Sequence, residues 1–546
     1  MKDHRSLTQS MSWLHTWSGL LIGWLLFAIF FTGTLAVFDR ELNWWMQPEL
    51  VDRQIDQSTA AAMAQRWLQA EHPEAQRWNI GLPTEREPQL SVSAGEQRRG
   101  QRTLLDPQTG EVIAPRETVG GSFFFRFHHT LQLPRTIGIW LVGFAGMTML
   151  VGIISGVIIH KKIFKDFFTF RPAKGQRTWL DGHAATAVLL LPFHLMITYT
   201  GLAIFAQVYM PAASEVLYDG DRQAMMRDVR GGGERGGEQG GNPEANAGGE
   251  QRGAAGNGQR SGARAEGSAP VATADLLPLD AFIERGEAFY GEGLVNSLTV
   301  INPGQANARV EVSPVLGSRI ELTKGEHLTY NSVTGEAIDL PEPSRPTKLT
   351  QRVIAGLHFA QFGGYGMRWL YFVSGMVSCA LIASGLVIYT VKRRRQSKPG
   401  STEGKAFLRL VESLNTAAVS GLVLASVVLL WTNRLLPQGL AERELWEMRL
   451  FFGCWLLSLL HARLREPFRA WREQLYAITV LGLALPLLNM LTGEDYIDAT
   501  RLAVDATTVA MALLAGWAAR KVRRQQLAGK TLVRRKTRVM ATEAPQ

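Results

Sequence analysis

The sequence predicts a mainly α-helical membrane protein with about eight transmembrane helices, in which a helix–module–helix unit is duplicated. Long apolar runs, each able to cross a bilayer, alternate with polar segments along the 546 residues. One pattern occurs twice, because a histidine precedes a Thr-Gly pair by 17 residues at His15 and again at His183. The polar segments that follow these two copies also resemble each other, so each unit contains a small α+β module.

The two copies of the histidine pattern span the thickness of a membrane. A helix of 17 residues rises roughly 25 Å, which is close to the hydrocarbon thickness of a bilayer. Each copy therefore places a histidine near one membrane face and a Thr-Gly pair near the other. Histidines in membrane helices are costly and usually functional.

Composition limits the classes of function. The net charge of +10 does not indicate nucleic-acid binding, because many Lys and Arg residues lie in short loops between the spans. By the positive-inside rule these residues indicate cytoplasmic loops and termini. The two cysteines, Cys379 and Cys454, both lie inside apolar spans. They exclude a four-cysteine iron–sulfur cluster and a Cys-x-x-Cys-His haem attachment site, so a redox metal would depend on the eleven histidines.

The first copy of the unit occupies the N-terminal part of the chain. We expect a first transmembrane helix at residues 12–39 and a module at 40–122. A surface helix with a second span follows at 123–160, then a cytoplasmic loop at 161–180 and a third span at 181–209. In the module, 59–72 has helix-forming residues, and short alternating runs follow as strands. The surface helix is aromatic and basic.

The second copy and a C-terminal region follow. The second module lies at residues 210–350 and contains a Gly-rich insertion at 230–269 that is expected to be disordered. A surface helix with a fourth span follows at 351–392. A cytoplasmic loop, a four-helix membrane region and a basic cytoplasmic tail follow at residues 393–412, 413–520 and 521–546. Two copies in the same orientation imply a pseudo-twofold axis along the membrane normal.

The span-associated histidines fall into groups at two depths. His15, His160 and His183 lie near the cytoplasmic face, and His128, His129 and His358 lie near the outer face. Two groups at two depths suit two stacked haems, since a haem held by two imidazoles carries electrons. Equivalent residues of the two copies can meet at the axis, which predicts the axial pairs His15–His183 and His129–His358.

Other residues leave these assignments open. His160 has Tyr389 as its counterpart and can replace either inner ligand, whereas His194, in mid-membrane, can serve the outer haem or bridge the two. Arg135 and Arg368, with Arg126, can pair with haem propionates, although snorkelling at the interface explains these arginines almost as well. Glycines in the spans either allow close helix packing, the reading that we favour, or make room for a macrocycle.

At these residues the sequence resembles the PepSY-associated transmembrane proteins. The resemblance is carried by His15…Thr32-Gly33, by the surface segment His128–Leu131, and by the module turns Asp106-Pro-Gln-Thr-Gly110 and Asn331-Ser-Val-Thr-Gly335. It covers about residues 10–395 and implies PepSY-like modules in the periplasm. Members of this family in bacterial inner membranes include haem-containing ferric-siderophore reductases.

The resemblance and the histidines together lead to an expected function. We expect an inner-membrane oxidoreductase with two haems b that passes electrons to a periplasmic Fe(III)-siderophore or another ferric chelate. No Gly-x-Gly-x-x-Gly fingerprint follows a strand, so a separate donor is required, either membrane quinol or a cytoplasmic reductase. Membrane lipid is the other expected partner.

Two alternatives have no redox chemistry. The modules resemble domains linked to peptidase inhibition, which favours a membrane-anchored regulatory or binding protein. Parallel repeats also occur in transporters, but the spans lack paired acidic residues of an ion pathway, and Asp505 is the main candidate. A visible spectrum of the purified protein separates the redox hypothesis from both.

Deletion of residues 230–269 is predicted to leave expression and folding unchanged, because this segment has almost no large apolar residues to bury. Size-exclusion chromatography and the melting temperature of the purified deletion variant test this. A large loss of folded protein would mean that the segment is part of the structure.

Overall fold

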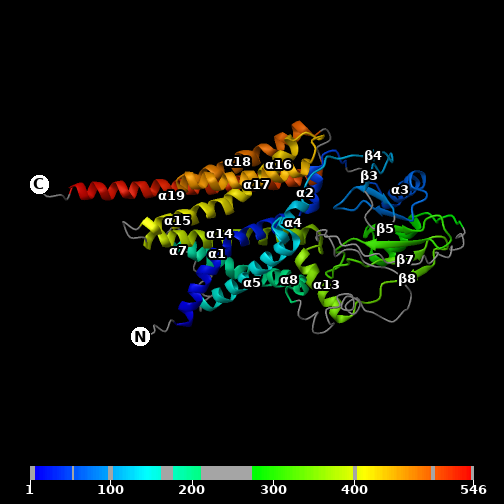
Figure 1. The fold of residues 1–546 in the computed structure, drawn as a ribbon, viewed down its shortest axis with the longest axis horizontal. Coiled ribbons are helices and arrows are strands. Elements are labelled where there is room, and N and C mark those ends of the chain that lie inside the picture. Colours follow the sequence, from blue (N-terminus) through cyan, green and yellow to red (C-terminus); the bar gives the residue numbers. More distant parts are fainter. Residues whose placement is uncertain are drawn as a thin grey trace, which may run out of the picture.

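The computed structural model describes residues 6–51, 55–95, 102–160, 176–210, 273–396, 402–493 and 498–542. A long helical body carries a β-sheet at one end, and both chain termini lie at the opposite end (Figure 1). We call the two ends of the helical body the module end and the far end. The Gly-rich insertion at 230–269 and most of the loop at 161–180 lie outside the described residues.

The protein is a multi-pass membrane protein. Six helices of the described part are long and apolar enough to cross a membrane, or seven if a bent pair counts as one span. The sequence suggested about eight. The remaining helix of that set, α17 (Arg443–Leu464), does form with 22 residues, but charged side chains in its first turns keep it outside the six.

The duplicated unit contributes four of these crossings. They are α1 (Leu7–Ala36), α5 (Arg135–Ile159), the bent pair α7 (Gln176–Leu189) and α8 (Leu191–Ile204), and α14 (Gly364–Gln396). Helix α1 packs against both α5 and α14, whereas α8 packs against α5, and α7 packs against α14. A capping box between Ser6 and Gln9 satisfies backbone amides at the start of α1.

The third span is not one straight helix. Helices α7 and α8 meet at Leu190 with a bend of 63°. Pro192 stands in the first turn of α8, where a proline has no amide to continue the hydrogen bonds of the preceding helix. The short helix α9 (Ala206–Tyr209) follows. The bend therefore interrupts the regular helical rotation between His183 and His194.

A short surface helix precedes the second helix of each unit at the module end. These are α4 (Ser122–Thr130) and α13 (Pro346–Phe359). Each ends in a residue with left-handed backbone, Leu131 at φ 57° and Ala360 at φ 50°. Both caps donate their amide to the carbonyl four residues earlier, so the two surface helices end in the same way.

The two modules form one continuous antiparallel sheet. The first supplies β1 (Arg77–Gly81), β2 (Leu90–Ala94), β3 (Thr103–Leu105) and β4 (Val112–Ile113), and the second β5 (Val295–Ile301), β6 (Arg309–Pro314), β7 (Leu328–Asn331) and β8 (Ala337–Asp339). The order is β4-β3-β2-β1-β5-β6-β7-β8, with Asn79 opposite Thr299 where the halves meet. Two separate modules were expected, whereas pairing of β1 with β5 removes an exposed edge from each half.

The duplicated turns have the same local structure. In the first, Asp106 Oδ1 accepts hydrogen bonds from the amides of Gln108 and Thr109, and in the second Asn331 Oδ1 accepts from the corresponding pair. Gly110 at φ 75° and Gly335 at φ 76° end the two turns in the left-handed region. The similarity of these turns is therefore structural.

One helix from each module covers the sheet. They are α3 (Gln57–Glu71) and α12 (Asp280–Tyr290), which contact each other. Their apolar residues share a core with the inward-facing residues of both halves, for example Leu68, Ile80, Phe282 and Leu298. Since this core is continuous, the two modules are a single packing unit.

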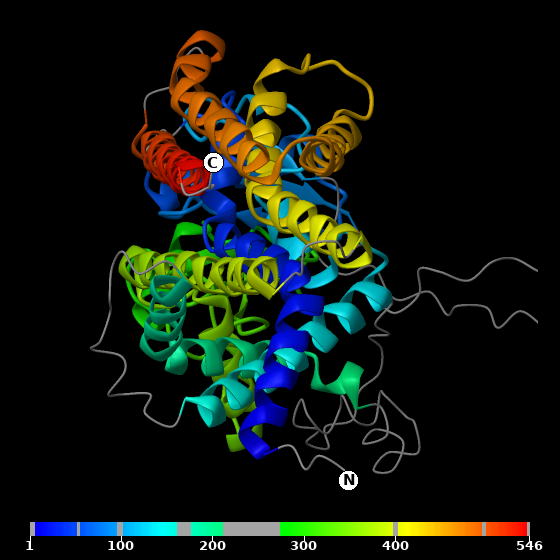
Figure 2. The same cartoon turned by 90° about the vertical axis from the view of Figure 1, so that its left-hand side faces the viewer.

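The C-terminal region stands beside the duplicated unit. It comprises α15 (Thr402–Thr416), the π-helical turn η1 (Ala417–Gly421), α16 (Leu422–Leu435), α17, α18 (Pro467–Thr492) and α19 (Ala499–Thr542). The short helix α2 (Asp39–Met46), which follows α1, contacts α16 and α19. Viewed along the helices, these C-terminal helices occupy one side of α1 and the helices of the duplicated unit the other (Figure 2).

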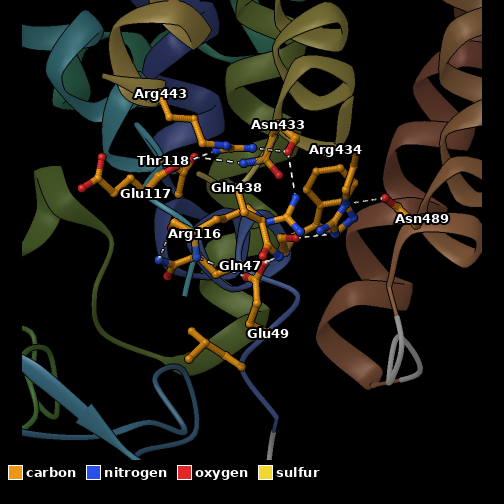
Figure 3. A network of polar contacts seen from close by, with 12 residues as sticks. Gln47, Glu49, Arg116, Glu117, Thr118, Asn433, Arg434, Gln438, Arg443 and Asn489 are labelled. Carbon is orange, nitrogen blue, oxygen red and sulfur yellow. Dashed lines mark hydrogen bonds and ion pairs between the residues drawn. The ribbon is translucent and has the colours of Figure 1, made fainter. Parts of the chain in front are cut away.

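Buried arginines join the C-terminal helices to the first module at the module end (Figure 3). Arg116 from the loop after β4 binds Glu49 at 2.6 Å and donates to the carbonyl of Asn433 on α16. Arg434 donates to Asn489 on α18 and to the carbonyl of Trp45. Because losing one partner of a buried charged pair is strongly destabilising, this network fixes the C-terminal region in one position.

Candidate functional site

His15 on α1 and His183 on α7 face each other in the far-end half of the duplicated unit. Their ring centroids are 6.4 Å apart, with an angle of 76° between the ring planes. The sequence spacing predicted this pair, and the structure brings the two side chains together. We call them the far-end pair.

The two rings of the far-end pair are held by equivalent contacts. His15 Nδ1 lies 3.0 Å from the carbonyl oxygen of Gly152 and 3.2 Å from Ser155 Oγ on α5. His183 Nδ1 lies 3.1 Å from the carbonyl oxygen of Leu381 and 3.0 Å from Ser384 Oγ on α14. A carbonyl oxygen only accepts, so each Nδ1 carries the proton, and each Nε2 keeps its lone pair.

A second histidine pair lies at the module end. His128 on α4 and His358 on α13 have ring centroids 6.1 Å apart and ring planes at 31° to each other. His128 Nδ1 donates to the carbonyl oxygen of Ile29 at 2.8 Å. His358 Nδ1 lies 3.1 Å from Thr200 Oγ1 and also hydrogen-bonds the backbone of Ile197. We call these residues the module-end pair.

The module-end pair corrects the predicted partner of His358. Counting equal intervals along the two copies selected His129, but the structure places His128 against His358. One residue turns a helix by about 100°, and His129 is directed along its own helix, with Nδ1 2.7 Å from the carbonyl oxygen of Phe125. The repeat interval alone does not resolve such a shift of one residue.

Glycines make room for the four imidazoles. A Cβ built on Gly33 would lie 2.5 Å from His128 Nδ1, and one on Gly201 would lie 2.8 Å from His358 Cε1. At the far end, Gly156 and Gly385 face His15 and His183 at 3.5 and 3.2 Å. The glycine of each Thr-Gly pair therefore accommodates a histidine ring from a surface helix, which neither of the two interpretations of the sequence had foreseen.

The remaining predicted histidines lie outside the two pairs. His160 follows the last residue of α5 and lies near His15 and His183. His194 on α8 is buried, with Nε2 2.8 Å from Ser378 Oγ on α14. Because that hydroxyl donates to the carbonyl of Ser374, it accepts from His194, whose proton is then on Nε2.

The predicted arginines occupy different surroundings. Arg135 begins α5 and is exposed, as is Arg126, and both lie near His129. Arg368 on α14 is buried and donates to the carbonyl oxygen of Gln361 at 3.1 Å, with its guanidinium over the ring of Tyr365. The structure therefore does not gather these arginines around one histidine pair.

The ring-centroid separations of both pairs match the separation of two imidazoles bound to one metal ion. A metal–nitrogen distance of about 2.0–2.1 Å on each side places two opposed ring centres roughly 6.3 Å apart, and the pairs measure 6.4 and 6.1 Å. Metal-binding histidines almost always donate their other ring N–H to a carbonyl or a similar acceptor, as all four rings do here. In the described part of the chain no three His, Cys, Asp or Glu side chains gather as a metal site.

Comparison with known proteins agrees with this architecture. The profile of the family described as the PepSY-associated TM region matches residues 12–392. The chain belongs to this family. An uncharacterized protein of Pseudomonas aeruginosa is 26% identical over 335 residues, which cover 59% of this chain and 75% of the relative. The match to the PepSY-associated TM region contains both histidine pairs and ends before the C-terminal helices.

Replacing Gly33 by alanine is predicted to destabilise the protein by about 1–3 kcal/mol, because the new methyl group overlaps the His128 ring. Gly19→Ala on the same helix is the matched control, since nothing lies within 4 Å of its Cβ position. Melting temperatures of the two detergent-solubilised variants test this, and equal melting temperatures would contradict the contact.

Proposed function

We propose that this PepSY-associated membrane protein is a haem-dependent reductase that passes electrons across a bacterial inner membrane to an external Fe(III) chelate, such as a ferric siderophore. The observation that carries the proposal is the presence of two histidine pairs at opposite ends of the duplicated helical unit. Each pair has both Nδ1 atoms hydrogen-bonded, and both Nε2 atoms remain available as ligands.

The residues fit one haem b in each pair. His15 and His183 would hold one iron and His128 and His358 the other, with no cysteine attachment. Haem iron with two imidazole ligands supplies one-electron transfer. The chain fixes the ligand tautomers, since Gly152, Leu381 and Ile29 each accept the Nδ1 proton from a neighbouring helix. Rings that are already held in place lose little conformational freedom when they bind a metal.

The positions of the pairs support transfer across the membrane. Between His15 and Thr32, α1 rises roughly 25 Å, so the pairs lie near opposite faces of the bilayer. The basic residues Arg393–Arg395 end α14 at the far end, which the positive-inside rule assigns to the cytoplasm. The sheet then lies in the periplasm, and both termini are cytoplasmic.

The chemistry of the substrate accounts for the direction. Oxygen-rich chelators hold the hard Fe(III) ion tightly and Fe(II) much less so, and one electron per iron therefore releases the metal. The module-end pair lies below the sheet, where an external chelate arrives. The described fold contains no βαβ nucleotide-binding unit, so the reducing equivalents come from a separate donor.

The test is a comparison of adjacent histidines. The purified protein is predicted to be red with a low-spin b-type spectrum, and His128→Ala is predicted to remove about half of the haem and nearly all ferric-chelate reduction. His129→Ala, the matched control, keeps both, because His129 does not reach His358. Haem-to-protein ratios from the pyridine haemochrome assay decide.

Three outcomes would contradict the proposal. They are colourless protein from haem-replete cells, equal haem loss in both variants, and loss of the same haem in His15→Ala and His358→Ala.

A further inference from the structure

A cavity of about 540 Å³ lies between the duplicated unit and the C-terminal helices. Helices α1, α2, α4 and α14 form one wall, and α16, α18 and α19 form the other. Its volume is in the usual range for sites that bind small organic molecules. The histidine pairs do not line it, and the electron transfer proposed above does not involve it.

The cavity is amphipathic. Six aromatic side chains contribute to its lining, namely Phe31, Phe38, Phe124, Tyr365, Trp369 and Phe372. Its polar end lies near the start of α14, where the Tyr365 hydroxyl hydrogen-bonds Glu41. Glu85 also contributes to the wall there. The apolar remainder extends along α18 and α19 within the depth of the membrane.

The polar groups of the lining are hydrogen-bond acceptors. The wall contains two acids, Glu41 and Glu85, and neither Lys nor Arg. Burial alone would raise the pKa of Glu41, but hydrogen bonds and the charge of Arg86 lower it below its ordinary value, so this carboxyl is ionised. Arg86 binds both oxygens of Glu41, but each carboxylate oxygen can accept a further hydrogen bond, so a ligand with hydroxyl donors finds acceptors there.

The cavity lies close to the module-end pair. Phe31 of α1 lines it, and Gly33, two residues later and roughly 200° around the helix, contacts His128. Phe124, one turn before His128 on α4, also lines it. The cavity and the pair are therefore separated by about one helix diameter, on the order of 10–12 Å, a distance that electrons cross by tunnelling in redox proteins.

We propose that this cavity binds an isoprenoid quinol, with the ring between the aromatic side chains and the hydroxyls toward Glu41 and Tyr365. The inference rests on the proposed haem-dependent reductase and names a membrane donor that supplies the module-end pair directly, without passage through the far-end pair. One quinol loses two electrons and two protons and becomes the quinone. Two external Fe(III) ions become Fe(II), and the protons leave at the module end past Glu41 and Glu85. The C-terminal helices thereby acquire a role as the second wall of the donor site.

The binding test uses a short-chain azidoubiquinone as a photoaffinity probe on the full-length protein in nanodiscs. We expect labelled peptides from the cavity segments of α14 and α19. Ala503→Trp fills the cavity and is predicted to reduce labelling and quinol-driven ferric-chelate reduction at least tenfold. Leu502→Trp, its neighbour, is absent from the lining and directed outward, and is predicted to change neither.

The outcomes separate the two proposals. Red protein in which the probe labels no cavity peptide, or in which both tryptophan variants behave alike, overturns the quinol site and leaves the reductase proposal intact. Copurification of phospholipid in the cavity without competition by quinone overturns it too. Colourless protein overturns the reductase, whether or not the probe binds.

Discussion

The hydrogen bonds from the imidazoles to main-chain carbonyls of neighbouring helices are the interaction on which the arrangement depends. Four rings are fixed in this way, and all four acceptors lie on helices other than the ring's own, namely Gly152, Leu381, Ile29 and Ile197. In the first copy α1 presents His15 to α5 and receives His128 from α4, and the second copy does the same with α7, α8, α13 and α14. Duplication thus creates two-histidine sites from single histidines, because each unit supplies one ring to each site.

The sheet also contains one half from each copy of the duplicated unit. Asn79 and Thr299 face each other where β1 meets β5, and Thr299 Oγ1 lies 3.2 Å from Asn79 Oδ1. A shared sheet and a shared core join the two modules into one unit. The C-terminal helices stand outside the symmetry. Buried arginines such as Arg434 attach them to the segment that follows α1, and the cavity lies between these helices and the duplicated unit.

Much of this arrangement could be predicted from the sequence, because the duplication makes its signals appear twice. The His15–His183 pair and the turns at Asp106 and Asn331 were predicted from such repeated spacings. The choice of His128 over His129 could not be, since it depends on how a surface helix is rotated against Gly33. The fused sheet and the cavity arise from contacts between segments far apart in the chain, for which one sequence gives no periodic signal. The bend at Leu190 had a local signal in Pro192, which the apolar run around it concealed.

Electron paramagnetic resonance of the oxidised protein tests the two-pair account most directly, because the low-spin ferric signal depends on the angle between axial imidazole planes. The far-end pair, with planes at 76°, predicts a strongly anisotropic signal, and the module-end pair, at 31°, predicts a rhombic one. We expect both signals in equal amounts, with the anisotropic one lost in His183→Ala. A single signal, a high-spin ferric spectrum or no haem signal at all would contradict the account.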